Sequence, residues 1–97
     1  MGMRDLKIRF APEAARFIAN LHSENRKIIR QALDQIRRNP YSGHDLQEEL
    51  SGFKSFKSKR YRIIYKVEER NSSIDVYVVG HRRDVYEQFR ALLKSLK

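Results

Sequence analysis

The sequence contains no cysteine and no long apolar run. Without cysteine, none of the 97 residues can form a disulfide or act as a thiolate nucleophile, and nothing indicates an oxidising compartment. No apolar stretch approaches the roughly 20 residues that a membrane-spanning helix needs. The N-terminus also lacks the apolar segment of a secretory signal. The three histidines are scattered, which argues against a zinc site. We therefore expect a cytoplasmic protein with no membrane association, no cofactor and no metal.

Positive charge is the strongest feature of the composition. The chain has 21 Lys+Arg against 12 Asp+Glu, a formal net charge of +9. Residues 51–97 hold 12 basic and 5 acidic side chains, whereas residues 1–50 hold 9 and 7. A positive field of this kind attracts nucleic acid or an acidic protein partner.

The N-terminal half predicts a strand and two helices. Residues 5–10 alternate polar and apolar side chains, which is typical of a short strand. Two apolar stripes at helical spacing follow, and Pro12 suits the first turn of the first helix. Asn39-Pro40 ends the second helix, because the residue before a proline is disfavoured in the α region. The short connection between the two helices predicts a helical hairpin.

The C-terminal half predicts three strands and a tail helix. The strands span 53–58, 61–67 and 74–79, and the helix spans about 84–96. Their short connections predict an antiparallel meander. The chain is therefore expected to be a single α+β domain, 1–97, with the order β-α-α-β-β-β-α. Its antiparallel sheet would carry the helical hairpin on one face and leave the other face partly open.

Basic and aromatic side chains gather on the predicted second and third strands. Alternation along 61–67 places Arg62 and Lys66 on the more polar face. This pattern suits a phosphate backbone with bases that stack on aromatic rings. His44 lies apart, in a predicted loop, with no companion at metal-ligand spacing. The cations of residues 54–66 are Lys54, Lys57, Lys59, Arg60, Arg62 and Lys66.

The end of the last strand supplies a second group of reactive side chains. Residues 80–87 contain His81, Arg82 and Tyr86 directly after an apolar run. Antiparallel pairing of the last two strands would bring Arg82 beside Arg62, so that both could contact one phosphate. Tyr86 could approach the same place. His81 has the side chain best suited to proton transfer near neutral pH, although it should point to the opposite face from Arg82.

These residues resemble a known family, the RelE/ParE superfamily of bacterial and archaeal toxins. The resemblance rests on Leu50-Ser51-Gly52, on Tyr61-Arg62-Ile63-Ile64-Tyr65 and on the run from Val79 to Tyr86. The order of the elements matches as well. The four-residue spacing from Arg82 to Tyr86 resembles the RelE branch more than the ParE branch.

The resemblance implies a function and roles for individual residues. It implies a toxin of a type II toxin-antitoxin system that cuts mRNA on the ribosome without metal and is neutralised by a cognate antitoxin. Arg62 and Arg82 would hold the scissile phosphate, and Tyr86 would orient or deprotonate the attacking 2′-hydroxyl or stack on a base. Lys57 stands where many relatives have arginine. Lys59-Arg60 stands where many have a turn glycine.

Two alternatives remain open from the sequence. One is a ParE-like inhibitor of DNA gyrase with no nuclease step. The other is an inert basic module that binds an acidic partner or nucleic acid. Under every hypothesis we expect an acidic or amphipathic partner segment to bind, because the helices carry apolar stripes and residues 51–97 are strongly basic.

Overall fold

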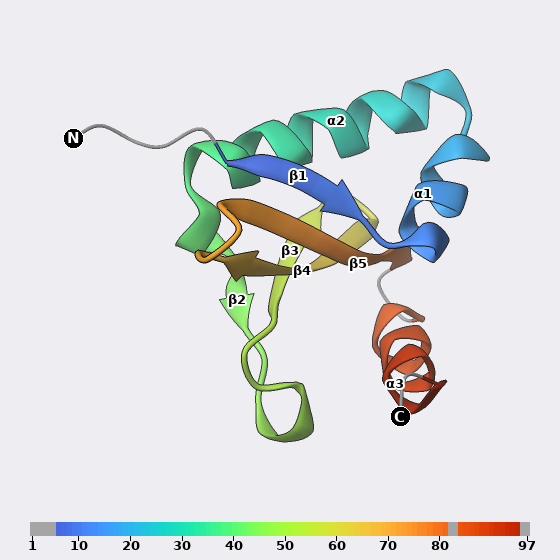
Figure 1. The fold of residues 1–97 in the computed structure, drawn as a ribbon. Coiled ribbons are helices and arrows are strands. Elements are labelled where there is room, and N and C mark those ends of the chain that lie inside the picture. Colours follow the sequence, from blue (N-terminus) through green and yellow to red (C-terminus); the bar gives the residue numbers. More distant parts are fainter. Residues whose placement is uncertain (1–5, 82–83, 96–97) are drawn as a thin grey trace.

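A computed structural model describes residues 6–81 and 84–95 of the chain. Over these residues it contains a five-stranded sheet, with strand order β1-β5-β4-β3-β2, and three α-helices (Figure 1). The α+β class expected from the sequence is confirmed. The elements are β1 Lys7–Phe10, α1 Pro12–Ala19, α2 Ser23–Arg38, β2 His44–Asp45, β3 Lys54–Ser58, β4 Tyr61–Glu68, β5 Ser73–His81 and α3 Val85–Ser95, with 3₁₀ turns at Pro40–Ser42 and Glu48–Leu50.

The antiparallel meander of β3, β4 and β5 follows the prediction. Lys59 and Arg60 form the tight turn between β3 and β4, with Lys59 in the left-handed region at a φ of 54°. Within the sheet Arg62 pairs with Lys57 on one side and with Gly80 on the other. This register brings the end of β5 beside the start of β4, as the sequence predicted.

The edges of the sheet differ from the prediction. β1 pairs with β5 in parallel, so the sheet is mixed rather than wholly antiparallel. The reason is visible in Figure 1, where β1 leads directly into α1, which packs on β5. A two-residue strand, β2, was expected to be loop and pairs with β3. β5 also runs to His81 rather than stopping at Val79.

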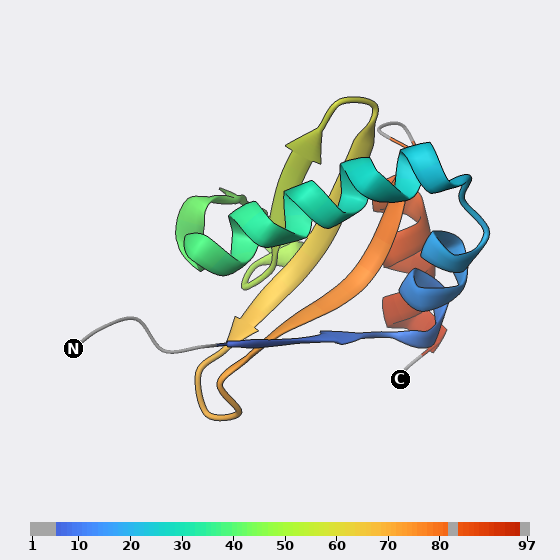
Figure 2. The ribbon, with the colours of Figure 1, turned by 90° about the horizontal axis from the view of Figure 1, so that it is seen from above.

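One face of the sheet is covered by α1 and α2, and this face holds the larger core. Figure 2 shows α2 running across the sheet, with α1 at an angle to it. α1 packs against β5, and α2 packs against β3. Period-2 alternation sends the odd-numbered residues of β4 toward the helices. The buried residues of this core are Ala14, Ile29, Ala32, Ile36, Tyr61, Ile63, Tyr65, Ile74, Val76 and Val79.

The opposite face is less open than the sequence suggested, because α3 packs on it. Val85 and Phe89 of α3 are fully buried. They pack in one cluster with Ile64 and Val78 of the sheet and with Leu50, which ends the 3₁₀ turn between β2 and β3. Phe89 also contacts the ring of Phe53, with centroids 4.7 Å apart. The tail helix is therefore packed on the body, and the uncovered part of this face lies toward β3 and β2.

We expect Phe89→Ala to lower the free energy of unfolding by about 3–5 kcal/mol, since it removes a fully buried aromatic side chain from the smaller core. Denaturant unfolding followed by circular dichroism measures this change. Lys94→Ala, at an exposed position of the same helix, is the control and should change stability by less than about 0.5 kcal/mol. Equal small losses in both variants would mean that α3 contributes little to the fold.

Candidate functional site

Arg62, Tyr86 and Ser55 form a hydrogen-bonded chain across three elements. Arg62 of β4 donates from Nη1 to the hydroxyl of Tyr86 on α3, at 2.7 Å. That hydroxyl donates in turn to Oγ of Ser55 on β3, at 3.2 Å. The Arg62 guanidinium also lies over the Tyr86 ring, 5.8 Å from its centroid. The proximity of Arg62 and Tyr86 predicted from strand register is thus present in the structure.

A groove of about 480 Å³ lies beside this chain, and we call it the arginine groove. It combines cations, hydroxyls and an imidazole with one apolar ring. Alternation along β3 puts Ser55 and Lys57 on the same face as their cross-strand partners Ile64 and Arg62. The groove is therefore suited to a polyanion. Its lining residues are Ser42, Gly43, His44, Ser55, Phe56, Lys57 and Arg62.

Within the part of the chain that the structure describes, only some of the hydrogen-bond donors of Arg62 have a partner. Its Nε is buried and has no hydrogen-bond partner there, although Nη1 is bound to Tyr86. A guanidinium carries five N–H donors in a fixed fork that matches a phosphate. Leaving a buried charged donor unpaired costs free energy. An anion that drew the guanidinium into the groove would relieve this cost.

His44 is held at the groove by a contact between Tyr65 and the loop before β2. The buried Tyr65 hydroxyl donates to the carbonyl of Pro40 at 2.8 Å and accepts from the Gly43 N–H at 3.1 Å. Burial raises the pKa of Tyr65, so the phenol stays neutral and keeps both bonds at physiological pH. β2 begins at the next residue, and His44 pairs there with Ser55. The imidazole consequently lines the same groove as Arg62.

Gly43→Ala should displace this loop, because a Cβ at Gly43 would lie 2.5 Å from the Tyr65 hydroxyl oxygen. We expect a loss of about 1–3 kcal/mol in the free energy of unfolding, measured by denaturant titration. Adding Tyr65→Phe, which removes that oxygen, should recover part of the loss. A single Gly43→Ala variant as stable as the wild type would contradict the role assigned to this contact.

His81 lies on the other face of the sheet from Arg62. Its ring stacks on Tyr61, with centroids 5.3 Å apart, and contacts Phe17 edge-on at 6.1 Å. Both neighbours belong to the helix-covered side. The structure does not bring His81 together with Arg62 and Tyr86. Arg82, the second expected phosphate ligand, lies outside the described residues.

The remaining predicted phosphate-binding cations are dispersed. Lys57 lines the arginine groove. Lys54 points to the opposite face and binds Asp45, whose pKa it lowers through their hydrogen bond. Lys66, farther along β4, forms an ion pair with Glu68 at 3.3 Å.

The two turn cations, Lys59 and Arg60, are exposed at one end of the sheet. Arg60 reaches toward α2, where it donates to Oδ1 of Asn25 at 3.4 Å. Its guanidinium also lies 5.8 Å from the centroid of the Tyr61 ring. Of the cations predicted on the second and third strands, the structure therefore brings together Lys57 and Arg62.

Comparison with known protein families shows to which family the chain belongs. The family described as ParE toxin of type II toxin-antitoxin system, parDE, matches residues 8–86. The chain belongs to this toxin family. No curated protein matches the sequence.

Solved structures similar to this toxin share its fold over most of the chain. The RelBE2 toxin-antitoxin complex from Mycobacterium tuberculosis aligns at 25% identity and a TM-score of 0.72, covering 81% of this chain and 100% of that one. A mutant of the E. coli toxin RelE in the free state aligns at 17% identity and a TM-score of 0.75, covering 94% and 98%. The YoeB dimer from Staphylococcus aureus aligns at 22% identity and a TM-score of 0.66, and the alignment covers 81% of this chain and 99% of that one.

Two residues of the toxin's groove were not singled out from the sequence. Ser55 was passed over between more conspicuous lysines, yet it is 4% exposed and bonded to Tyr86. Ser55 and Lys57 are two residues apart on one predicted strand, so the alternation of side chains could have placed both on the same face. His44 was assigned to a loop, because a strand of two residues has no periodicity to recognise.

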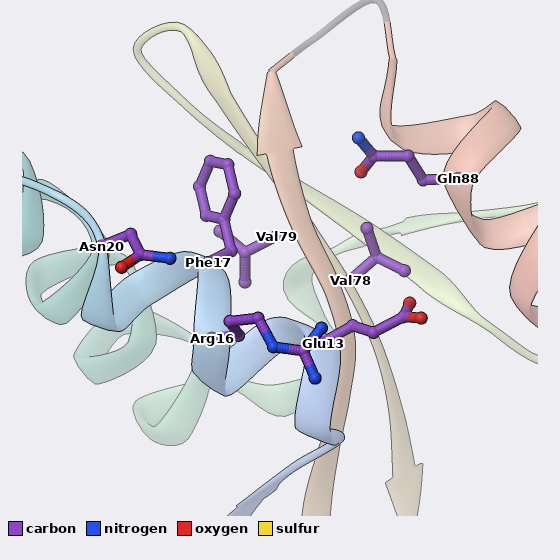
Figure 3. A pocket seen from close by; sticks show the side chains of 7 residues that line it. All are labelled: Glu13, Arg16, Phe17, Asn20, Val78, Val79 and Gln88. Atoms are coloured by element: carbon purple, nitrogen blue, oxygen red, sulfur yellow. The ribbon is translucent and has the colours of Figure 1, made fainter.

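A second hollow of about 400 Å³ lies between α1, β5 and α3 of the toxin (Figure 3). Phe17, Val78 and Val79 give it an apolar floor, and polar side chains of α1 and α3 surround them. It contains none of the residues predicted from the sequence to act on RNA. The described residues also contain no group of three or more His, Asp or Glu side chains placed to hold a metal ion, and none of their helices could span a membrane.

Proposed function

We propose that this toxin is a ribosome-dependent endoribonuclease that cuts mRNA in the ribosomal A site without a metal ion. The observation that carries the proposal is the hydrogen bond between Arg62 and Tyr86 beside a groove lined by Lys57 and His44. Two cations, a phenol and an imidazole thus converge from three strands and a helix.

RNA can be cleaved by its own 2′-hydroxyl, so no protein nucleophile is required. The 2′-oxygen forms a bond to phosphorus, the bond from phosphorus to the 5′-oxygen breaks, and a 2′,3′-cyclic phosphate results. A proton leaves the 2′-hydroxyl, and another reaches the departing 5′-oxygen. The protein must therefore transfer protons and stabilise the charge that grows on the phosphoryl oxygens.

The groove offers a residue for each of these tasks. Arg62 and Lys57 stabilise the charge, together with Arg82 as proposed from its position in the sequence. Tyr86 orients the 2′-hydroxyl or exchanges a proton with it, while Ser55 holds the phenol. His44 also lines the groove, and its imidazole, which can both accept and donate a proton, carries the second proton. The position of His81 on the opposite face supports assigning it no direct contact with the reacting atoms.

The other predicted cations attract RNA without touching the reacting phosphate. Lys54, Lys59, Arg60 and Lys66 contribute to the positive field around the groove. In the cytoplasm the toxin is held inactive by a cognate antitoxin, a partner suggested by the crystal structures of RelBE2 from M. tuberculosis and of RelBE from E. coli, both toxin-antitoxin complexes.

The second candidate function is inhibition of DNA gyrase. It is favoured by one observation, the match of residues 8–86 to the ParE toxin family. A gyrase inhibitor needs only a binding surface, and its function does not require a phenol bonded to a half-buried arginine beside a groove. The Arg62–Tyr86–Ser55 chain therefore favours the nuclease.

Expression in bacteria without the antitoxin separates the two functions. We expect growth arrest, mRNA fragments whose ends fall within translated codons, and no accumulation of gyrase-cleaved DNA. Mapping RNA 5′ ends and trapping gyrase–DNA complexes in the same cultures measures both. Intact mRNA together with trapped gyrase complexes would establish the second function. A harmless protein would exclude both.

A further inference from the structure

The hollow between α1, β5 and α3 lies at a part of the sheet edge that no strand covers, and we call it the β5 hollow. β1 pairs with residues 73–76 of β5 and ends at Phe10, after which the chain turns into α1. Within the part of the chain that the structure describes, residues 77–81 therefore have β4 on one side and no strand on the other. This free edge forms the floor of the hollow, between α1 and α3 (Figure 3).

Phe17 gives the β5 hollow an aromatic ring that two neighbours hold in place. It lies edge-to-face with Tyr61, at 6.2 Å between ring centroids, and with His81, at 6.1 Å. Tyr61 and His81 are themselves stacked, 5.3 Å apart. The Phe17 ring is therefore oriented before any ligand arrives. Together with Val78 and Val79 it offers an apolar surface on which a planar ligand can lie.

Four polar side chains surround this apolar floor. Two of them, Glu13 and Arg16, carry opposite charges, and the other two, Asn20 and Gln88, are amides. Among the residues that the structure describes, none of the four side chains forms a hydrogen bond or an ion pair. A few unpaired polar groups around an apolar floor are typical of a pocket for a small organic ligand. Because the two charges balance, the hollow does not favour a phosphate as the arginine groove does.

The two amides stand on opposite sides of the free edge. Asn20 ends α1, and Gln88 lies on α3 close to the strand, since a Cβ added at Gly80 would lie 3.0 Å from its Oε1 (Figure 3). Each amide carries two N–H donors and a carbonyl acceptor. Asn and Gln side chains pair with adenine through its N6 and N7 atoms. A neutral, planar ring with donors and acceptors at its rim, such as adenine, therefore matches both the floor and the walls.

A free strand edge can also accept an extended peptide, but an irregularity in this edge disfavours one. The register of β5 against β4 shifts at Ile64 and Tyr65, so that Tyr77 lies opposite no residue of β4. A bulge of this kind twists the strand and disturbs the regular spacing of backbone groups that a pairing strand needs. A single base needs only a few hydrogen bonds at one place, so the bulge does not hinder it.

We propose that the β5 hollow binds an adenine base, which stacks on Phe17 and is recognised by the side-chain amides of Asn20 and Gln88. This site is separate from the arginine groove, and the inference does not depend on nuclease activity. The same chemistry fits the adenine of a free nucleotide and an unstacked adenine in single-stranded RNA. The test distinguishes these two sources.

The test titrates the toxin with AMP and with UMP, which carries the same phosphate, and follows the amide signals by NMR. We expect AMP to shift the signals of Val78, Val79 and the two side-chain amides, and to bind about tenfold more tightly than UMP. Asn20→Ala/Gln88→Ala should weaken AMP binding about tenfold. The matched control, Gln31→Ala/Asn71→Ala, removes one exposed Gln and one exposed Asn outside the hollow and should bind AMP like the wild type.

Circular dichroism confirms that both variants fold. Equal binding of AMP and UMP, equal losses in the two variants, or signal shifts confined to the arginine groove would overturn the inference. So would the absence of binding at AMP concentrations up to about 10 mM. A loss of antitoxin affinity in the Asn20→Ala/Gln88→Ala variant, with AMP binding unchanged, would assign the hollow to a protein segment and also overturn it.

Ribosome-dependent cleavage by the Asn20→Ala/Gln88→Ala variant separates the two sources of the base. A selective loss of cleavage at codons that contain adenine would place an adenine of the mRNA in the hollow. An unchanged cleavage pattern together with lost AMP binding would assign the hollow to a free nucleotide. A wild type that binds AMP in the hollow but cuts no mRNA would refute the proposed function and leave the adenine site standing.

Discussion

Replacing Arg62 with lysine should lower the rate of ribosome-dependent mRNA cleavage by about 10²–10³-fold, the usual cost of losing one donor to a developing negative charge. Lysine keeps the positive charge but loses the planar fork that binds a phosphate through two parallel hydrogen bonds. It also loses the 2.7 Å bond to the Tyr86 hydroxyl. Single-turnover cleavage of a defined mRNA by saturating toxin measures the chemical step separately from binding.

The matched control is Arg70→Lys, in the exposed turn between β4 and β5. This variant carries the same chemical change away from the groove and should cleave at the wild-type rate. An Arg62→Lys variant that also cleaves at the wild-type rate would show that Arg62 acts as a simple cation, and the geometric argument for the site would fail.

Tyr86→Phe should reduce the single-turnover rate by about 10²–10⁴-fold, the range expected when a positioned proton-transfer group is removed. The phenylalanine ring still fills its place under the Arg62 guanidinium, 5.8 Å away in the wild type. What disappears is the hydroxyl that links Arg62 to Ser55. The loss should therefore fall on the rate at saturation, with little change in RNA affinity.

A structural role for Tyr86 would give a different pattern. If the hydroxyl only holds α3 in place, Tyr86→Phe should lower the free energy of unfolding by about 1 kcal/mol and leave cleavage intact. Tyr77→Phe, a half-buried phenol on β5 in the same core, serves as the control for losing a hydroxyl. Wild-type cleavage by the Tyr86→Phe variant would remove Tyr86 from the mechanism.

The helices, the meander and the meeting of Arg62 with Tyr86 could be predicted from the sequence. Each of these features depends on local periodicity or on the register of strands joined by a short turn. Both can be inferred from residues that are close in the sequence. The apolar stripes at helical spacing predict α1 and α2. The short turn at Lys59 and Arg60 sets the register of β3 against β4, and the short turn at residues 69–72 sets the register of β4 against β5, which places Arg62 opposite Gly80.

Features that depend on contacts between distant segments were beyond sequence reasoning. β2 is two residues long and is placed by Tyr65, more than twenty positions away. β1 pairs in parallel because α1 packs on β5, which the sequence of β1 does not encode. α3 covers part of the face expected to be open, because Phe89 buries itself there.

Counting cations also overstated the candidate site. Six cations between Lys54 and Lys66 suggested one continuous basic surface, but charge number does not say which side chains already have partners. Lys54 and Lys66 are engaged with Asp45 and Glu68, and of the six, Lys57 and Arg62 line the groove. The functional assignment therefore depends on geometry more than on net charge.

The central claim is that this toxin cuts mRNA on the ribosome, and one measurement tests it most directly. Purified toxin is added to a reconstituted translation reaction, and the 5′ ends of a defined mRNA are mapped with and without ribosomes. We predict cuts within the codon in the ribosomal A site that depend on ribosomes and form about 10²–10³-fold more slowly with the Arg62→Lys variant. An mRNA that stays whole on translating ribosomes, while the same protein preparation blocks DNA supercoiling by gyrase, would contradict the account.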